Sequence, residues 1–140
     1  MAEKNLVIDT SGFFASAARL QSLAGDGSTL STPDLVVFEF AKVVAEEISR
    51  AKGSGNDRRT KLMLGLQQRF PKLLRELEVE VWSSGFSIDD VDRLYVEISK
   101  GHEPGDAMIW LRMQSKGFDT IATADPKDWN ALGAKVVPLA

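Results

Sequence analysis

Leu6-Val7-Ile8-Asp9-Thr10-Ser11 is the stretch of sequence that decides the fold. It begins with three apolar residues, two of them β-branched, which is typical of a buried strand. The strand stops at Asp9, because the turn-like cluster Asp9-Thr10-Ser11-Gly12 follows. We therefore predict a buried strand that places the Asp9 carboxylate at its carboxyl end.

Strands and helices alternate from this stretch to the end of the chain. Capping hydroxyls and a proline in Ser31-Thr32-Pro33 indicate a helix that begins there and runs to about Arg50. The other elements are expected as helices at Phe13–Leu23, at Arg58 to about Phe70 with a short one after Pro71, at Ser87 to about Lys100, at Pro104 to Lys116 and at Trp129–Leu132, and as strands at Leu77–Val81, Thr120–Thr123 and Lys135–Leu139. This alternation predicts an α/β fold: a three-layer α/β/α sandwich with a central, largely parallel sheet, forming a single domain over residues 1–140.

Composition restricts the chemistry available to such a domain. The 140 residues include no cysteine and a single histidine, His102, which excludes disulfides, zinc–thiolate sites, iron–sulfur clusters and multi-histidine sites. Any metal must be a hard ion held by oxygen, Mg²⁺ or Mn²⁺. The net charge of −3 argues against a scaffold that binds nucleic acid through overall charge. No signal peptide or membrane-spanning apolar run is visible, so we expect a cytoplasmic protein.

Four acidic side chains are candidates for holding such an ion. Asp9 and Asp125 each follow a predicted strand, at the edge where parallel α/β sheets bind ligands. Glu39 lies at the margin of the apolar face of its helix, and Asp106 begins a helix on the same stripe as apolar residues. Each of the four, taken alone, is also explained as a cap, a turn residue or a surface acid. Together they would repel one another without a divalent cation, so we predict a site for one or two hard ions that activate water at a phosphodiester.

In this order and spacing, the motifs resemble a PIN domain, the fold of VapC-type toxin ribonucleases. The resemblance covers essentially the full length and rests on Leu6 to Ser11, on Glu39 inside the second helix, on Gly105-Asp106-Ala107-Met108-Ile109, and on Thr123-Ala124-Asp125 followed by Asp128-Trp129. The chain departs from the family at Trp110, where small residues are usual, which affects pocket shape and substrate choice.

The resemblance implies a metal-dependent endoribonuclease, the toxin of a VapBC-type toxin–antitoxin pair, that hydrolyses RNA with Mg²⁺ or Mn²⁺. Asp9, Glu39 and Asp106 correspond to the core catalytic acids and Asp125 to the fourth, with Asp9, Asp106 and Asp125 as the metal ligands. An RNA substrate, a cognate antitoxin protein and a second copy of the chain in a homodimer are the implied partners, with no membrane.

Three further residues carry over in supporting roles. Thr123 and Ser11 match hydroxyl positions that can hydrogen-bond the carboxylates or water on the metal, and Asp128 is an additional candidate acid, equally explained as a helix cap. We expect His102 to be a surface or loop-packing residue, because the implied mechanism needs no imidazole.

Two other classes of function remain open. One is a catalytically inactive PIN-like module that binds RNA or protein; the complete acid set argues against it. The other is a different α/β phosphohydrolase with Asp9 as nucleophile, although Ser11 stands where enzymes resembling haloacid dehalogenases carry a second Asp.

Two groups of side chains lie outside the acid set. The basic residues either grip RNA phosphates or form a solvated helical face; they are Arg50, Lys52, Arg58, Arg59 and Lys61. Phe13, Phe14 and Phe40 are expected in the core or at a dimer interface rather than as base-stacking platforms.

Overall fold

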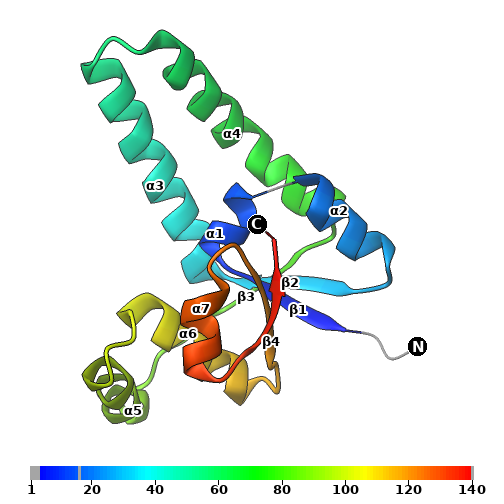
Figure 1. The fold of residues 1–140 in the computed structure, drawn as a ribbon, viewed down its shortest axis with the longest axis vertical. Helices are drawn as coiled ribbons and strands as arrows, with labels where there is room; N and C mark the ends of the chain where they lie inside the picture. The colour runs from blue at the N-terminus through cyan, green and yellow to red at the C-terminus, as the bar shows by residue number, and fades with distance from the viewer. Residues whose placement is uncertain (1–3, 16, 140) are drawn as a thin grey trace.

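A computed structural model describes residues 4–15 and 17–139. The strands are β1 (Asn5–Ile8), β2 (Thr29–Pro33), β3 (Glu80–Trp82), β4 (Thr120–Thr123) and β5 (Lys135–Pro138). The helices are α1 (Thr10–Phe14), α2 (Ala17–Gly25), α3 (Asp34–Gly53), α4 (Asp57–Glu76), α5 (Ile88–Ser99), α6 (Pro104–Ser115) and α7 (Pro126–Leu132). Figure 1 shows this chain path, and the predicted α/β/α sandwich is confirmed.

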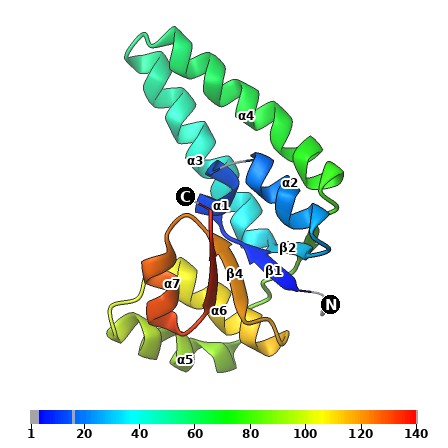
Figure 2. The ribbon, with the colours of Figure 1, turned by 45° about the vertical axis from the view of Figure 1, so that its right-hand side comes forward.

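The sheet has the strand order β3-β2-β1-β4-β5, and every pairing in it is parallel. The chain moves outward from β1 to β3 and then returns to β4 on the other side of β1. Because crossovers between parallel strands are right-handed, this reversal places α1 to α4 on one face and α5 to α7 on the other, as Figures 1 and 2 show. The strand order therefore reverses between β1 and β4, where open α/β sheets bind ligands beyond the carboxyl ends of the strands.

The segment Ser31-Thr32-Pro33 belongs to a strand, so the helix start predicted there is wrong. β2 lies between β1 and β3, which buries Ser31 and Thr32 to 3% and 0% exposure. Their hydroxyls are satisfied inside the sheet: Thr32 Oγ1 donates to the Ile8 carbonyl at 2.7 Å, and Ser31 Oγ accepts from Trp82 Nε1 at 3.2 Å. The helix begins one residue after Pro33.

Two other helix predictions are corrected. The helix expected over Phe13–Leu23 is divided into α1 and α2, with Ala15 outside both and Ser16 outside the described residues. The break predicted at Pro71 does not occur, because α4 continues through it for 20 residues. Buried Phe70 before Pro71 and partly buried Leu74 after it hold the helix against the core, which outweighs the loss of one backbone hydrogen bond.

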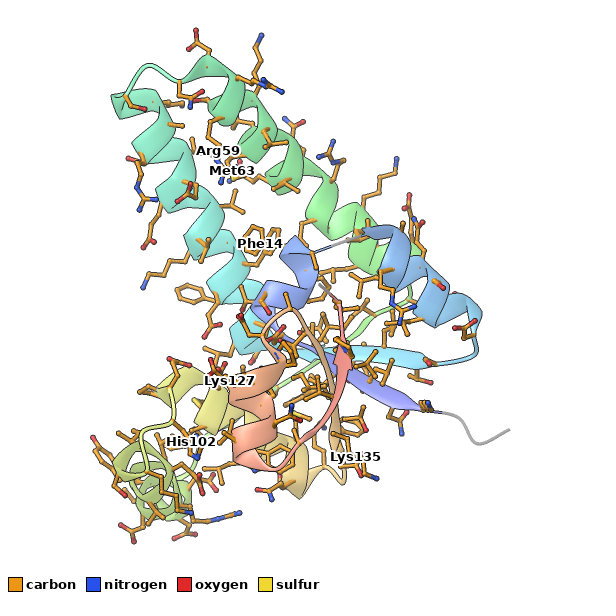
Figure 3. The ribbon with its side chains drawn as sticks, in the orientation of Figure 1. Phe14, Arg59, Met63, His102, Lys127 and Lys135 are labelled. Carbon is orange, nitrogen blue, oxygen red and sulfur yellow. The ribbon has the colours of Figure 1, made fainter. Side chains whose placement is uncertain are left out.

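Helices α3 and α4 form an antiparallel arm that projects from the sheet (Figures 1 and 2). Val44 and Met63 are buried along the arm, and Arg59 pairs with Glu47 of α3 at 3.3 Å; Arg59 and Met63 are labelled in Figure 3. None of the helices within the described residues has the length and apolar content needed to cross a bilayer.

An aromatic cluster joins the base of the arm to α1. The rings of Phe40 and Phe70 stack with centroids 3.9 Å apart, Phe14 stacks on Phe40 at 4.4 Å, and Phe13 meets Phe70 edge-on at 5.0 Å. Phe13 and Phe40 are in the core as predicted, whereas Phe14 is half-buried. Since α1 follows β1 directly, this cluster fixes the arm relative to the carboxyl end of β1.

Candidate active site

The Asp9 carboxylate lies at the carboxyl end of β1 and is 5% exposed. Its Oδ1 accepts hydrogen bonds from Ser11 Oγ at 2.9 Å and from the Gly12 amide at 2.8 Å. Its Oδ2 accepts from Thr123 Oγ1 at 2.7 Å and from Trp129 Nε1 at 2.9 Å. Asp9 therefore caps α1, as the simpler interpretation allows, but it also has three side-chain donors from β4, α7 and its own turn. Two donors on each oxygen hold the carboxylate in one orientation.

Gly12 permits this close arrangement. A Cβ atom at this position would lie 2.8 Å from the Ala122 carbonyl oxygen and 2.9 Å from Ile8 Cγ2. Only glycine lets the first turn of α1 approach β1 and β4 so closely, and the approach brings the Gly12 amide to Asp9.

The Glu39 carboxylate reaches the same region from α3. It is half-buried, and its Oε2 accepts a hydrogen bond from Thr10 Oγ1 at 2.7 Å. Its other oxygen, Oε1, lies 3.0 Å from the place a Cβ atom would take on Gly105, at the start of α6. Glu39 therefore lies between the turn after β1 and the first turn of α6, as its position at the margin of the apolar face predicts.

Glu103, which sequence reasoning did not identify, caps the amino terminus of α6. Its carboxylate accepts hydrogen bonds from the amides of Gly105 at 2.9 Å and Asp106 at 2.7 Å. The capping role is thereby filled, so the alternative explanation of Asp106 as the helix cap is wrong. The carboxyl group of Asp106 is therefore available for another role.

Asp106 has an unusual protonation equilibrium. Burial, followed by the negative charges of Glu103, Asp9, Glu39 and Asp128, raises the pKa of Asp106 from its ordinary value of 3.8 to about 7. Charged neighbours act at short range, so Asp9, Glu39, Asp106 and Asp128 lie together in one acidic cluster. We call this cluster the acidic pocket, because Asp106 and Asp128 line a pocket at the surface. A positive ion in this pocket would offset the unfavourable energy of gathering these charges.

Asp125 and Asp128 contribute differently from what the sequence suggests. Asp125 precedes α7; its side chain is exposed, its amide donates to Thr123 Oγ1 at 3.0 Å, and it is not among the carboxylates that raise the pKa of Asp106. Asp128, in the first turn of α7, is among them. Thr123 and Ser11 hydroxyls lie 3.0 Å apart, and both contact Asp9 as supporting residues would.

A pocket of about 280 Å³ opens beside the acidic group. Its walls include Glu103, Asp106 and Asp128, together with Lys100 and His102. The side chain of His102 is 17% exposed and its Nε2 lies 3.5 Å from Glu97 Oε2, consistent with the predicted loop-packing role. The pocket therefore has carboxylates on one part of its wall and groups able to carry positive charge on another.

The carboxylates suit a hard cation in chemistry, because carboxylate and hydroxyl oxygens are the ligands such ions prefer. Among residues 4–15 and 17–139, no three histidine or carboxylate side chains already stand as a ligand group for a metal ion. Both oxygens of Asp9 already accept two hydrogen bonds, so direct coordination there would require Ser11 or Thr123 to turn its hydroxyl away.

Trp129 and Trp110 show what sequence spacing left undecided. Trp129 is fully buried and donates to Asp9, which makes it a residue that positions the site. Trp129 follows Asp125 closely in the sequence, but nothing in the sequence indicates which carboxylate its indole contacts. Trp110, expected to affect the pocket, is instead part of the hydrophobic core and does not line the pocket beside Asp106.

This fold, with an acidic pocket at the switch point of a parallel sheet, is of the PIN-like class. Three solved structures share the fold, over nearly their whole length. PAE2754 from Pyrobaculum aerophilum is 20% identical with a TM-score of 0.59, covering 98% of this chain and 92% of that chain. A chain of VapBC2 from Rickettsia felis, solved with a DNA fragment from the VapBC2 promoter, is 12% identical with a TM-score of 0.64. The match covers 97% of this chain and 99% of that chain.

The third structure, a domain of a functionally unknown protein from Methanocaldococcus jannaschii, is 19% identical with a TM-score of 0.51, covering 98% and 91%. At these identities the likeness is one of fold, and the PIN-like fold predicted from the sequence is confirmed. Neither a protein-family model nor a curated protein matches the sequence.

Proposed function

We propose that this protein is a metal-dependent endoribonuclease that cuts RNA at the acidic pocket. The observation that carries the proposal is Asp106, whose pKa is raised to about 7 by burial and by four neighbouring carboxylates although Glu103 has taken over the capping role. Such a concentration of negative charge destabilises the folded chain, and it is useful only where a cation is to be bound. The likeness in fold to a chain of VapBC2 is consistent with this proposal.

Asp106 and Glu39 would hold Mg²⁺ or Mn²⁺, and Asp128 lies near them. Asp9 could also bind the ion once the hydroxyl of Ser11 or Thr123 turns away from it. When bound, such an ion polarises a phosphodiester and makes its water a better nucleophile. The chain's own contribution is orientation: Ser11, Thr123 and Trp129 hold Asp9, and Thr10 holds Glu39. We expect Asp125 to act at the pocket rim, and the products to carry 3′-hydroxyl and 5′-phosphate ends.

The alternative with Asp9 as a covalent nucleophile is less well supported. An attacking carboxylate needs a free lone pair directed at the phosphorus atom. Each Asp9 oxygen already accepts two hydrogen bonds, and the donors come from three different elements. A binding module without turnover has no need of the buried acids, which would only destabilise it.

We further propose that the chain is the toxin of a toxin–antitoxin pair, a homodimer acting in the cytoplasm and inhibited by a cognate antitoxin. This part rests on the sequence resemblance and on the likeness in fold to VapBC2, a complex solved with DNA from its promoter.

Incubation of the purified chain with labelled RNA, in Mg²⁺, Mn²⁺ or EDTA, tests the enzymatic proposal. We expect cleavage with either ion, none with EDTA, and none by Asp106→Asn or Asp9→Asn. Lys135→Gln serves as the control and should cut normally, because Lys135 is exposed at the amino end of β5 and pairs with Asp119, which is not one of the proposed site acids. Undiminished cleavage by Asp106→Asn would refute the assignment.

A further inference from the structure

Helix α4 carries a concentration of positive charge that the proposed cleavage site does not use. Its 20 residues include six cationic and two acidic side chains, a net charge of +4 in a chain whose net charge is −3. The rest of the molecule is therefore strongly acidic. Positive charge is thus most concentrated along this helix, which favours the approach of a polyanion there.

Five of the six cations share one side of the helix. At 3.6 residues per turn they fall within about 120° around the axis, and each is exposed: Arg58, Lys61, Arg69, Lys72 and Arg75. We call this surface the α4 cationic face. It extends over about 25 Å, at 1.5 Å per residue. The opposite side of the helix packs on α3 through buried Met63 and carries Arg59, which pairs with Glu47 (Figure 3).

The charges on this face are largely uncompensated. Lys72 has Glu76 at 4.0 Å, a marginal distance for an ion pair. Within the described part of the chain, Arg58, Lys61, Arg69 and Arg75 are in no ion pair. Placing four unpaired cations side by side costs stability in the free protein, and an external polyanion would remove that cost.

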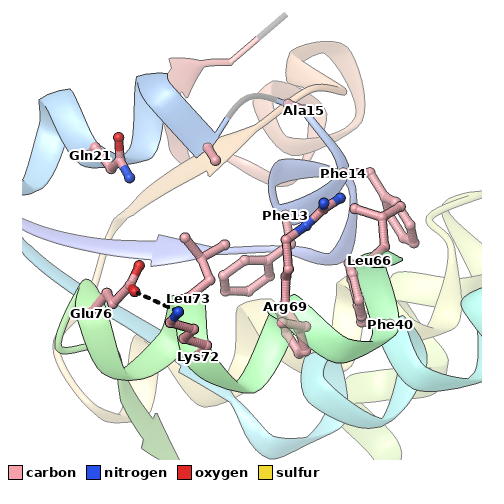
Figure 4. Close-up of a pocket in the computed structure, with 12 residues that line it drawn as sticks. Phe13, Phe14, Ala15, Gln21, Phe40, Leu66, Arg69, Lys72, Leu73 and Glu76 are labelled. Atoms are coloured by element: carbon pink, nitrogen blue, oxygen red, sulfur yellow. Dashed lines mark ion pairs between the residues drawn. The ribbon is translucent and has the colours of Figure 1, made fainter. Parts of the chain in front are cut away.

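One end of the α4 cationic face borders α1, the helix that follows Asp9. Arg69 and Lys72 line a pocket of about 490 Å³ whose other wall includes Phe13, Phe14 and Phe40 (Figure 4). Phe13 and Phe14 belong to α1, which begins at the residue after Asp9. Phe40 follows Glu39 in the sequence. A strand of nucleic acid lying on α4 would thus reach the acids by passing one short helix.

We propose that the α4 cationic face binds the phosphodiester backbone of single-stranded RNA and leads it to the acidic pocket. This proposal rests on the proposed nuclease function and names the surface that holds the substrate outside the cut. Recognition along the face is through charge, because Leu62 is the one large hydrophobic side chain of α4 that is exposed. The apolar side chains lie at one end of the face, in the pocket that Arg69 and Lys72 line. A second copy of the chain would bring like charges together across a two-fold axis.

Binding of labelled polyuridine, followed by fluorescence anisotropy in EDTA, tests the proposal without cleavage. The variant is the triple substitution Arg58→Gln, Lys61→Gln and Arg69→Gln. The matched control is Arg93→Gln, Lys116→Gln and Lys135→Gln, which removes three exposed cations from other elements. Circular dichroism melts verify that both triples are folded.

We expect the α4 triple to bind polyuridine at least about tenfold more weakly than the control at low salt. Loss of three phosphate contacts should also reduce the slope of log Kd against log salt by about 2, over about 50 to 200 mM. Equal slopes for the two triples would overturn the proposal. So would tighter binding of polyglutamate than of polyuridine, lost in the α4 triple, because the face would then recognise an acidic protein segment.

The two proposals fail in different ways. If the wild-type chain cuts RNA with Mg²⁺ while the α4 triple keeps the salt slope, the nuclease assignment stands and the α4 proposal is wrong. If polyuridine binds through α4 but no RNA is cut with any ion, α4 is an RNA-binding surface and the nuclease assignment is wrong. With both correct, the α4 triple raises KM for long RNA and leaves kcat unchanged.

Discussion

Replacing Asp106 by Asn should stabilise the metal-free protein while it abolishes function. The raised pKa of Asp106 means that the folded state resists the charged form of this side chain. Asn has nearly the same shape and carries no charge, so it removes the repulsion from the neighbouring carboxylates and keeps the packing.

The magnitude follows from the pKa. The difference between 3.8 and about 7 corresponds to at most about 4 kcal/mol. Asp106 is only half-buried, so water screens part of this energy, and we expect about 2 kcal/mol. For a chain of this length that raises the Tm by about 6–10 °C.

The pH dependence gives the prediction its sign. Because the pKa of Asp106 is higher in the folded state than in the unfolded state, the unfolded chain releases its proton first as the pH rises. The wild-type protein therefore loses stability between about pH 4 and about pH 7, and the full loss is present above pH 7. Asp106→Asn does not undergo this loss, so its stability relative to the wild type should be much higher near pH 8 and only slightly higher near pH 5.

Thermal melts in EDTA at these two pH values provide the measurement. Asp125→Asn is the matched control, since it makes the same chemical change at an exposed carboxylate that does not affect Asp106. Adding Mg²⁺ should raise the Tm of the wild type and so reduce the difference in Tm between Asp106→Asn and the wild type. A Tm for Asp106→Asn that is equal to or below that of the wild type near pH 8, or a gap that is the same at both pH values, would refute the reasoning.

Three other substitutions test the support of the site. Gly12→Ala should destabilise the chain by about 1–3 kcal/mol in urea unfolding, because the added Cβ would lie 2.8 Å from the Ala122 carbonyl oxygen. Gly25→Ala is the control, since a Cβ there has no neighbour within 4 Å. Equal destabilisation by the two substitutions would contradict the steric explanation. Trp129→Phe removes the indole donor to Asp9 and should lower the rate of RNA cleavage about 10–100-fold, with kcat rather than KM affected. Thr32→Val leaves a buried carbonyl of β1 without its donor and should cost about 1–2 kcal/mol by the same urea measurement; no change would show that the bond contributes nothing.

Several features of this protein could be read from short stretches of sequence. The apolar run before Asp9 predicts β1, and Thr120–Thr123 predicts β4, because a continuous apolar or β-branched segment is stable only when buried. The amphipathic segments between them predict helices for the same reason. Alternation of the two kinds of segment is enough to determine the α/β class.

Local patterns failed where burial came from neighbours in space. Ser31-Thr32-Pro33 has the composition of a helix start, yet it forms the carboxyl-terminal part of β2 because β1 and β3 enclose it and satisfy its hydroxyls. The break expected at Pro71 is prevented because Phe70 and Leu74, on either side of it, pack against the core. In each case long-range contacts outweigh a local preference of a few kcal/mol at most.

The sequence by itself determined that carboxylates follow β1 and begin α6, since these positions depend on where each strand and helix starts and ends. Only the tertiary structure decided which acids meet. Glu103 caps α6 in place of Asp106, Trp129 donates to Asp9, and Asp128 rather than Asp125 acts on Asp106. Electrostatic and hydrogen-bond energies depend on distances between atoms that are far apart in the chain. Those distances are set by the tertiary fold, in which the strand order reverses between β1 and β4.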